Sequence, residues 1–271
     1  MDVRVEINGA MVTETDVLEI EHWYRCYARS FASADSSVEP ILRLKEDHCV
    51  RVADEMRKLA AALKLDGEEV RVAVLAGLLH DIGRFAQYTQ YRTFVDAKSV
   101  NHAEVGVQVV MSAKLLDRFT QSVRALILDA VRFHNRAAVP DGLSEEGLRL
   151  ARLVRDADKL DIWHVVTAYY ESPDKARINA IDLDLPDSGW ISPAVAHAAQ
   201  SGALCDVKEL RSTNDYKVLQ MTWIYDVNFT ATFREIARRR FMERLRDALP
   251  RTALVDSIYR SVRRHLDAGL I

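Results

Sequence analysis

The stretch LAGLLHDIGRF, residues 75–85, indicates the fold of this chain more directly than any other part of the sequence. Its apolar residues are expected to bury it as a helix. The apolar run ends, just before a glycine, in an imidazole and a carboxylate side by side, His80 and Asp81. A buried charge is costly unless it is paired or bound to a metal ion, so this pair indicates an inward-facing metal site.

The chain before this pair predicts helices, because its apolar residues recur every three or four positions. One run covers about residues 16–33, and a second covers about 40–64, where Pro40 suits the start of a helix. Asp66, with Glu69 three residues later, matches a capping box for the helix that ends at the His-Asp pair.

Beyond the pair, the pattern predicts an irregular connection over residues 84–98 and then more helices. These helices are expected over about 100–114 with Ser99 as cap, over about 116–135, from Ser144 to about Tyr170, and over about 206–268. A short strand at residues 3–7 has weaker support. We therefore predict an all-α fold, a helical bundle with an additional C-terminal helical region.

The sequence shows no repeat or linker that would separate domains, so we predict one domain over residues 1–271. Its core spans about residues 40–170. The N-terminal helix at about 16–33 and the C-terminal helices at about 191–271 are expected to pack on this core.

Composition excludes several classes of function. The net charge of −3 argues against a protein held to nucleic acid or a membrane surface by bulk electrostatics. No segment approaches the run of about 18 apolar residues that a membrane span needs. The three cysteines, Cys26, Cys49 and Cys205, are far apart, which favours small core residues in a reducing compartment and a cytoplasmic location.

Further candidate metal ligands lie inside or beside the predicted helices. They are His48, His102, His134 and Asp158. Imidazole nitrogen and carboxylate oxygen, without cysteine, suit Fe, Mn, Co, Ni or Zn ions. The residues therefore point to a helical enzyme with a metal site.

This ordered set resembles the HD superfamily of metal-dependent phosphohydrolases, which is named after its His-Asp pair. The resemblance covers about residues 45–162. In that family the first histidine, the His-Asp pair and the last aspartate bind one metal ion. Matched residue by residue, these ligands are His48, His80, Asp81 and Asp158.

Two further histidines between the pair and the last aspartate occur in the binuclear branch of this superfamily. There the aspartate of the pair bridges two ions. The resemblance therefore implies that Asp81 is the bridge and that His102 and His134 hold a second ion. Asn135 and Asp161 are candidates either for groups that orient the ligands or for capping and surface roles.

A phosphorylated substrate also needs positive charge near the metal site. Arg84 follows HDIG, and its planar guanidinium suits phosphoryl oxygens. Lys45 lies on the same predicted helix face as His48 and is a second candidate. With Asp81, these two residues form the predicted catalytic set.

The resemblance implies a metal-dependent phosphohydrolase, either a phosphomonoesterase or a phosphodiesterase, that attacks a small phosphorylated metabolite or nucleotide with metal-activated water. It does not indicate which substrate. The alternative is a di-iron oxygenase similar to inositol oxygenase or to an organophosphonate-cleaving oxygenase, because these use the same six-ligand set. A non-catalytic binding module would be expected to have lost ligands, whereas all six positions hold competent residues.

Overall fold

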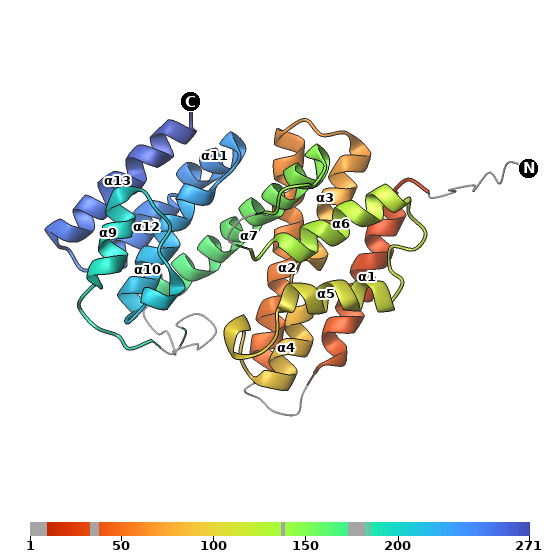
Figure 1. The fold of residues 1–271 in the computed structure, drawn as a ribbon, viewed down its shortest axis with the longest axis horizontal. Coiled ribbons are helices and arrows are strands. Elements are labelled where there is room, and N and C mark those ends of the chain that lie inside the picture. Colours follow the sequence, from red (N-terminus) through yellow and green to blue (C-terminus); the bar gives the residue numbers. More distant parts are fainter. Residues whose placement is uncertain (1–9, 33–37, 137–138, 173–182, 184) are drawn as a thin grey trace, which may run out of the picture. The chain divides into compact units, whose positions relative to one another are not determined.

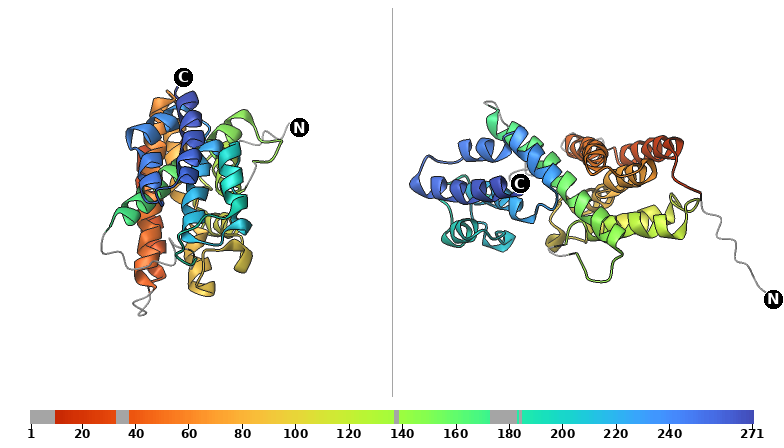
Figure 2. Two further views of the ribbon diagram at one scale, coloured as in Figure 1. Left: turned by 90° about the vertical axis from the view of Figure 1, so that its left-hand side faces the viewer. Right: turned by 90° about the horizontal axis from the view of Figure 1, so that it is seen from above.

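Helices form the regular structure throughout the computed structural model (Figure 1). The structure describes residues 10–32, 38–136, 139–172, 183 and 185–271. Within these residues the extended pairing is limited to one isolated bridge, between Ala10 and Phe119. Figure 2 shows the same helices from two further directions, again without a strand in the described parts. The all-α prediction is confirmed, and the strand predicted at residues 3–7 lies outside the described residues.

The chain divides into two compact units, Met1–Asp158 and Lys159–Ile271. The division falls inside the long helix α7 (Glu145–Glu171). The prediction of one domain over the whole chain stays a prediction. All six predicted metal ligands belong to the first unit.

The first unit is built around α3, which packs against α1, α2 and α6. Its elements are α1 (Glu14–Ser30), α2 (Glu39–Ala62), α3 (Gly67–Leu79), α4 (Gly83–Tyr91), the 3-10 turn η1 (Asp96–Lys98), α5 (His102–Ser112), α6 (Gln121–Phe133) and the first part of α7. Pro40 lies in the first turn of α2, as its position in the sequence predicts.

The predicted capping box starts α3. The Asp66 side chain accepts hydrogen bonds from the first turn, and the Glu69 side chain accepts one from the backbone of Asp66. Residues 72–79 are all buried. A Cβ at Gly77 would lie 2.6 Å from Cγ of Met56, so this glycine lets α2 and α3 approach closely. The burial of α3 carries the His-Asp pair at its end into the interior.

The prediction of an irregular connection over residues 84–98 is wrong, because α4 and η1 occupy most of this segment. The inner side of α4 is formed by Phe85 and Gln87, both buried. Phe85 packs edge-on against Tyr24, with ring centroids 5.9 Å apart. A buried glutamine and an aromatic residue do not give the aliphatic repeat that predicts a helix from sequence.

Two helix starts also differ from the prediction. Asn101, not Ser99, caps α5, because the Asn101 side chain accepts from the backbone of Ala103 and Glu104. The helix predicted over 116–135 begins at Gln121, after its cap Thr120. Both side chains satisfy backbone N–H groups that the first turn leaves without a helical partner.

The second unit contains the rest of α7 and a set of shorter helices, so the predicted C-terminal helical region is confirmed. Its elements are α9 (Pro193–Ser201), η2 (Val207–Glu209), α10 (Thr213–Thr222), η3 (Trp223–Asp226), α11 (Thr230–Arg238), α12 (Phe241–Asp247) and α13 (Ala253–Gly269). Trp163 is fully buried there and donates to the carbonyl of Gln220 at 2.9 Å. No helix of the described chain is both long enough and apolar enough to cross a membrane.

The cysteines correspond in part to the prediction. All three are free, and Cys49 and Cys205 are buried. Cys26 is exposed, so the expectation that it serves as a core residue is wrong. It lies on the outward side of α1, whose buried face includes Ile20 and Tyr24.

Candidate metal centre

The structure brings all six predicted ligands together inside the first unit. His48 lies within α2, and His102 is the first residue of α5. His80 and His134 occupy the C-terminal ends of α3 and α6. Asp81 follows His80, and Asp158 comes from α7. The four histidines and Asp81 are buried, and Asp158 is half-buried.

One group of donor atoms forms around Asp158. Its Oδ1 lies 3.1 Å from Nε2 of His48 and 3.7 Å from Nε2 of His80. These three ligand atoms are close enough together to surround a single ion. The helices α2, α3 and α7 each supply one of them.

A second group forms around the other side of the His-Asp pair. Oδ1 of Asp81 lies 3.1 Å from Nε2 of His102 and 3.4 Å from Nε2 of His134. The atoms of His80, Asp81 and His134 also meet the spacing of a metal site. His80 therefore lies between the two groups.

The two carboxylate oxygens of Asp81 face different histidines. Whereas Oδ1 faces His102 and His134, Oδ2 lies 3.8 Å from Nε2 of His48 and 3.7 Å from Nε2 of His80. A carboxylate placed in this way is suited to bridge two ions.

In three of the histidines, His80, His102 and His134, a hydrogen bond fixes Nδ1, the ring nitrogen that points away from the ligand cluster. Nδ1 of His80 lies 2.7 Å from the Gly77 carbonyl, and Nδ1 of His134 lies 2.7 Å from the Val131 carbonyl. A carbonyl only accepts, so Nδ1 donates in both residues and Nε2 of the neutral ring carries a lone pair. In His102 the carboxylate of Asp96 takes the same role. Such outer partners are typical of metal-binding histidines.

The inner nitrogens are arranged for a cation. Nε2 of His102 and Nε2 of His134 lie only 3.0 Å apart. Burial lowers the pKa of His134 to about 4, so its ring is neutral at pH 7. Two facing lone pairs repel unless a proton or a metal ion lies between them. Nε2 of His80 is buried without a hydrogen-bond partner among the described residues. The donor set therefore fits metal binding.

The two aspartates are held in the ionised form that a metal ligand needs. Burial by itself raises the pKa of Asp81, but Lys45 and Arg84 outweigh it and hold that pKa well below the usual range. For Asp158, burial also raises the pKa, and the imidazoles of His48 and His80 hold it well below the usual range.

Both predicted cationic residues contact Asp81. Nζ of Lys45 lies 2.8 Å from Oδ2, and Nε of Arg84 lies 3.2 Å from Oδ1. Nη1 of Arg84 also donates to the side chain of Gln87 and to the carbonyl of Phe94. These bonds fix the guanidinium beside the ligand cluster.

The sequence analysis missed Asp96 and Gln87. Nδ1 of His102 lies 2.8 Å from both oxygens of Asp96, and Nε2 of Gln87 donates to Asp96 at 2.8 Å. Asn135, which was predicted as an orienting group, donates to the other oxygen of Asp96 at 3.0 Å. Asp161, the other such candidate, is buried on α7 in the second unit. The burial of Gln87 and its hydrogen bond to Asp96 follow from tertiary packing, so no motif in the sequence marks this network.

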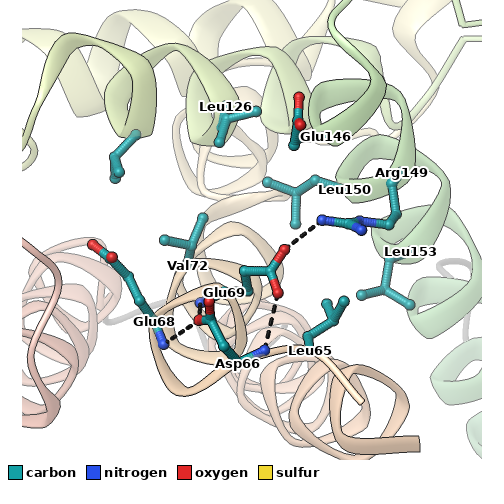
Figure 3. Close-up of a pocket in the computed structure, with 11 residues that line it drawn as sticks. Leu65, Asp66, Glu68, Glu69, Val72, Leu126, Glu146, Arg149, Leu150 and Leu153 are labelled. Atoms are coloured by element: carbon teal, nitrogen blue, oxygen red, sulfur yellow. Dashed lines mark hydrogen bonds and ion pairs between the residues drawn. The ribbon is translucent and has the colours of Figure 1, made fainter. Parts of the chain in front are cut away.

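A separate cavity of about 170 Å³ lies at the N-terminal end of α3 (Figure 3). The His-Asp pair follows the opposite, C-terminal end of this helix. Leucine and valine side chains from α3, α6 and α7 form its wall, and Arg149 makes an ion pair with Glu69 at its edge. None of the six candidate ligands lines it.

Comparison with known proteins agrees with this geometry. Residues 46–163 match the family model of the HD domain, and the matched range includes all six candidate ligands. No curated protein and no solved structure matches the chain in these comparisons. Residues 46–163 of this chain are therefore similar to the HD domain, a family whose members are generally metal-dependent hydrolases.

Proposed function

We propose that this protein is a metal-dependent phosphohydrolase, a phosphomonoesterase or phosphodiesterase, for a small phosphorylated metabolite or nucleotide. The observation that carries the proposal is the position of Asp81, whose two oxygens face two groups of histidines while Lys45 and Arg84 lie beside them. The donors suit divalent transition metals, and cationic side chains next to such a cluster suit an anionic substrate.

In this proposal His48, His80, Asp81 and Asp158 hold one ion. Asp81 is shared, and His102 and His134 hold a second ion. Such ions supply Lewis acidity, which activates water and neutralises negative charge on phosphoryl oxygens. The protein holds the ligands ready through the hydrogen bonds on their outer nitrogens, so little reorganisation is needed when the ions bind.

Arg84 and Lys45 are proposed to bind and orient the phosphoryl group. Arg84 donates hydrogen bonds to the described residues through Nε and Nη1, so we propose that Nη2 binds a substrate oxygen. The Lys45 ammonium is a compact point charge beside Oδ2 of Asp81, the oxygen that faces His48. The arginine fork would orient the phosphoryl group, and the lysine would add positive charge that attracts it.

The test is hydrolysis of a panel of phosphomonoesters and phosphodiesters by protein loaded separately with Mn²⁺, Co²⁺, Ni²⁺, Zn²⁺ or Fe²⁺. We expect activity that His80→Ala and Asp81→Ala abolish. His22→Ala is the matched control, because His22 is exposed on α1. Activity that survives both site substitutions would refute the proposal. Oxygen consumption by the iron-loaded protein with a polyol or phosphonate, without phosphatase activity, would favour the oxygenase instead.

A further inference from the structure

Asp96 lies on the outer side of His102, where it faces the ring nitrogen that points away from the ligand cluster. Resting on the proposed function, we propose that Asp96 is a positioning residue: it fixes His102 as a ligand and thereby decides whether the second ion is retained. Among the described residues, Asp96 contacts His102 through Nδ1 and does not contact the Nε2 atoms of the ligand histidines or Asp81.

The contact leaves His102 little choice of orientation. Nδ1 lies 2.8 Å from each oxygen of Asp96, so the N–H of the ring is directed between the two. The opposite nitrogen, Nε2, is thereby aimed at Asp81 and His134. The carboxylate also makes the imidazole a stronger electron donor than a carbonyl partner would.

Asp96 is held in place by three side chains. It accepts from Nε2 of Gln87 at 2.8 Å, from Nη1 of Arg84 at 3.2 Å and from Nδ2 of Asn135 at 3.0 Å. Gln87 is 1% exposed and also donates to Ser99 and to the backbone of Val100. A buried amide with this many fixed partners defines one position for the turn η1.

The other fixed histidines rely on their own helices. His80 and His134 each donate to a carbonyl three residues earlier, at Gly77 and Val131, so their orientation follows from helix geometry. His102 is at the very start of α5 and depends on a side chain of the preceding 3-10 turn. A substitution of Asp96 should therefore weaken binding of the second ion and leave binding of the first ion unchanged.

The experiment compares wild type with Asp96→Asn by equilibrium dialysis against Mn²⁺ followed by elemental analysis. We expect about two ions per chain in wild type and about one in the variant, with affinity for the second ion reduced about 10- to 100-fold. Asp117→Asn, at an exposed aspartate of the same unit, is the control and should retain both ions. Nitrogen NMR of His102 should show Nδ1 protonation in wild type and a mixture of tautomers in Asp96→Asn.

Equal binding of both ions by wild type and Asp96→Asn would overturn the inference, as would a single ion in wild type. If Asp96→Asn fails to fold, Asn135→Ala tests the inference instead. Asn135 is exposed, and its substitution removes one hydrogen bond that holds Asp96. Lower affinity of this variant for the second ion supports the inference, and unchanged affinity contradicts it. Dialysis measures metal binding and not hydrolysis, so the two proposals can fail separately. If the protein has no phosphatase activity but Asp96→Asn selectively loses the second ion, the proposed function is refuted and this inference is supported.

Discussion

Oδ1 of Asp81 lies 3.1 Å from Nε2 of His102, so the end of α3 meets the start of α5 at a single carboxylate oxygen. The other oxygen of Asp81 faces His48 and His80. This division of one carboxylate between two sets of imidazoles suits the binuclear centre proposed above. It depends on how closely the segment after Asp81 approaches α5.

That approach requires glycine at position 83. A Cβ on Gly83 would lie 2.1 Å from the carbonyl oxygen of His102 and 2.6 Å from the backbone nitrogen of Gly106. Because both neighbours are backbone atoms, Gly83→Ala should destabilise the first unit by about 1–3 kcal/mol. Urea unfolding followed by circular dichroism measures this change.

Gly67→Ala is the matched control for Gly83→Ala. Its Cβ would meet only the flexible end of Arg71, at 3.2 Å, in the exposed first turn of α3. We expect no loss of stability, or a gain of about 0.5–1 kcal/mol from the better helix former. Equal unfolding midpoints for the two variants would contradict the close packing of the segment against α5.

Lys45→Gln should lower kcat/KM for phosphorylated substrates about 10- to 100-fold in fully metal-loaded protein. A hydrogen bond from a charged group contributes about 1.5–3 kcal/mol, and about 1.4 kcal/mol corresponds to a factor of ten. Lys58→Gln, on the same helix but 61% exposed and paired with Glu55, should leave the rate unchanged. If the two variants behave alike, Lys45 does not contact the substrate.

Asp16 should stabilise the start of α1 in a pH-dependent way. Its carboxylate accepts from the backbone and hydroxyl of Thr13 and pairs with Arg118 at 2.9 Å. Burial raises the pKa of Asp16, but the bonds from Thr13 and the charge of Arg118 outweigh it and lower that pKa in the folded state. A lowered folded-state pKa means that the stabilisation is present above the unfolded-state value, about 4, and is lost as pH falls through the folded-state pKa.

We therefore expect Asp16→Ala to cost about 1 kcal/mol of unfolding free energy at pH 7, the usual contribution of a capping interaction. The difference from wild type should shrink below about pH 4. Asp54→Ala, at an exposed position of α2, should change stability by less than about 0.5 kcal/mol. A deficit for Asp16→Ala that stays constant between pH 7 and pH 3 would contradict this explanation.

Local sequence signals predicted the elements that carry the ligands. Asp66 with Glu69 fixed the start of α3, and Pro40 fixed the start of α2, because capping and proline geometry depend on neighbouring residues alone. The resemblance to the HD superfamily, carried by the order of histidines and aspartates, predicted which side chains meet, and helix patterns placed each of them in or beside a helix.

The segment after the His-Asp pair was not predictable in this way. The inner face of α4 is made by Phe85 and a buried Gln87, which gives no aliphatic repeat. Asp96 contacts His102 only because η1 folds back to the start of α5, and Gln87 and Arg84 from α4 fix it there. Such a network depends on tertiary packing, so neither a motif nor a periodicity reveals it.

The most direct test of the account is the metal content per chain of protein purified without chelators or a metal-affinity step, measured by elemental analysis. We expect about two transition-metal ions in wild type and about one in His102→Ala and His134→Ala. We expect fewer still in Asp81→Ala, since Asp81 faces both groups of histidines. One ion or fewer in wild type, with no further loss on substitution of His102 or His134, would contradict a binuclear centre.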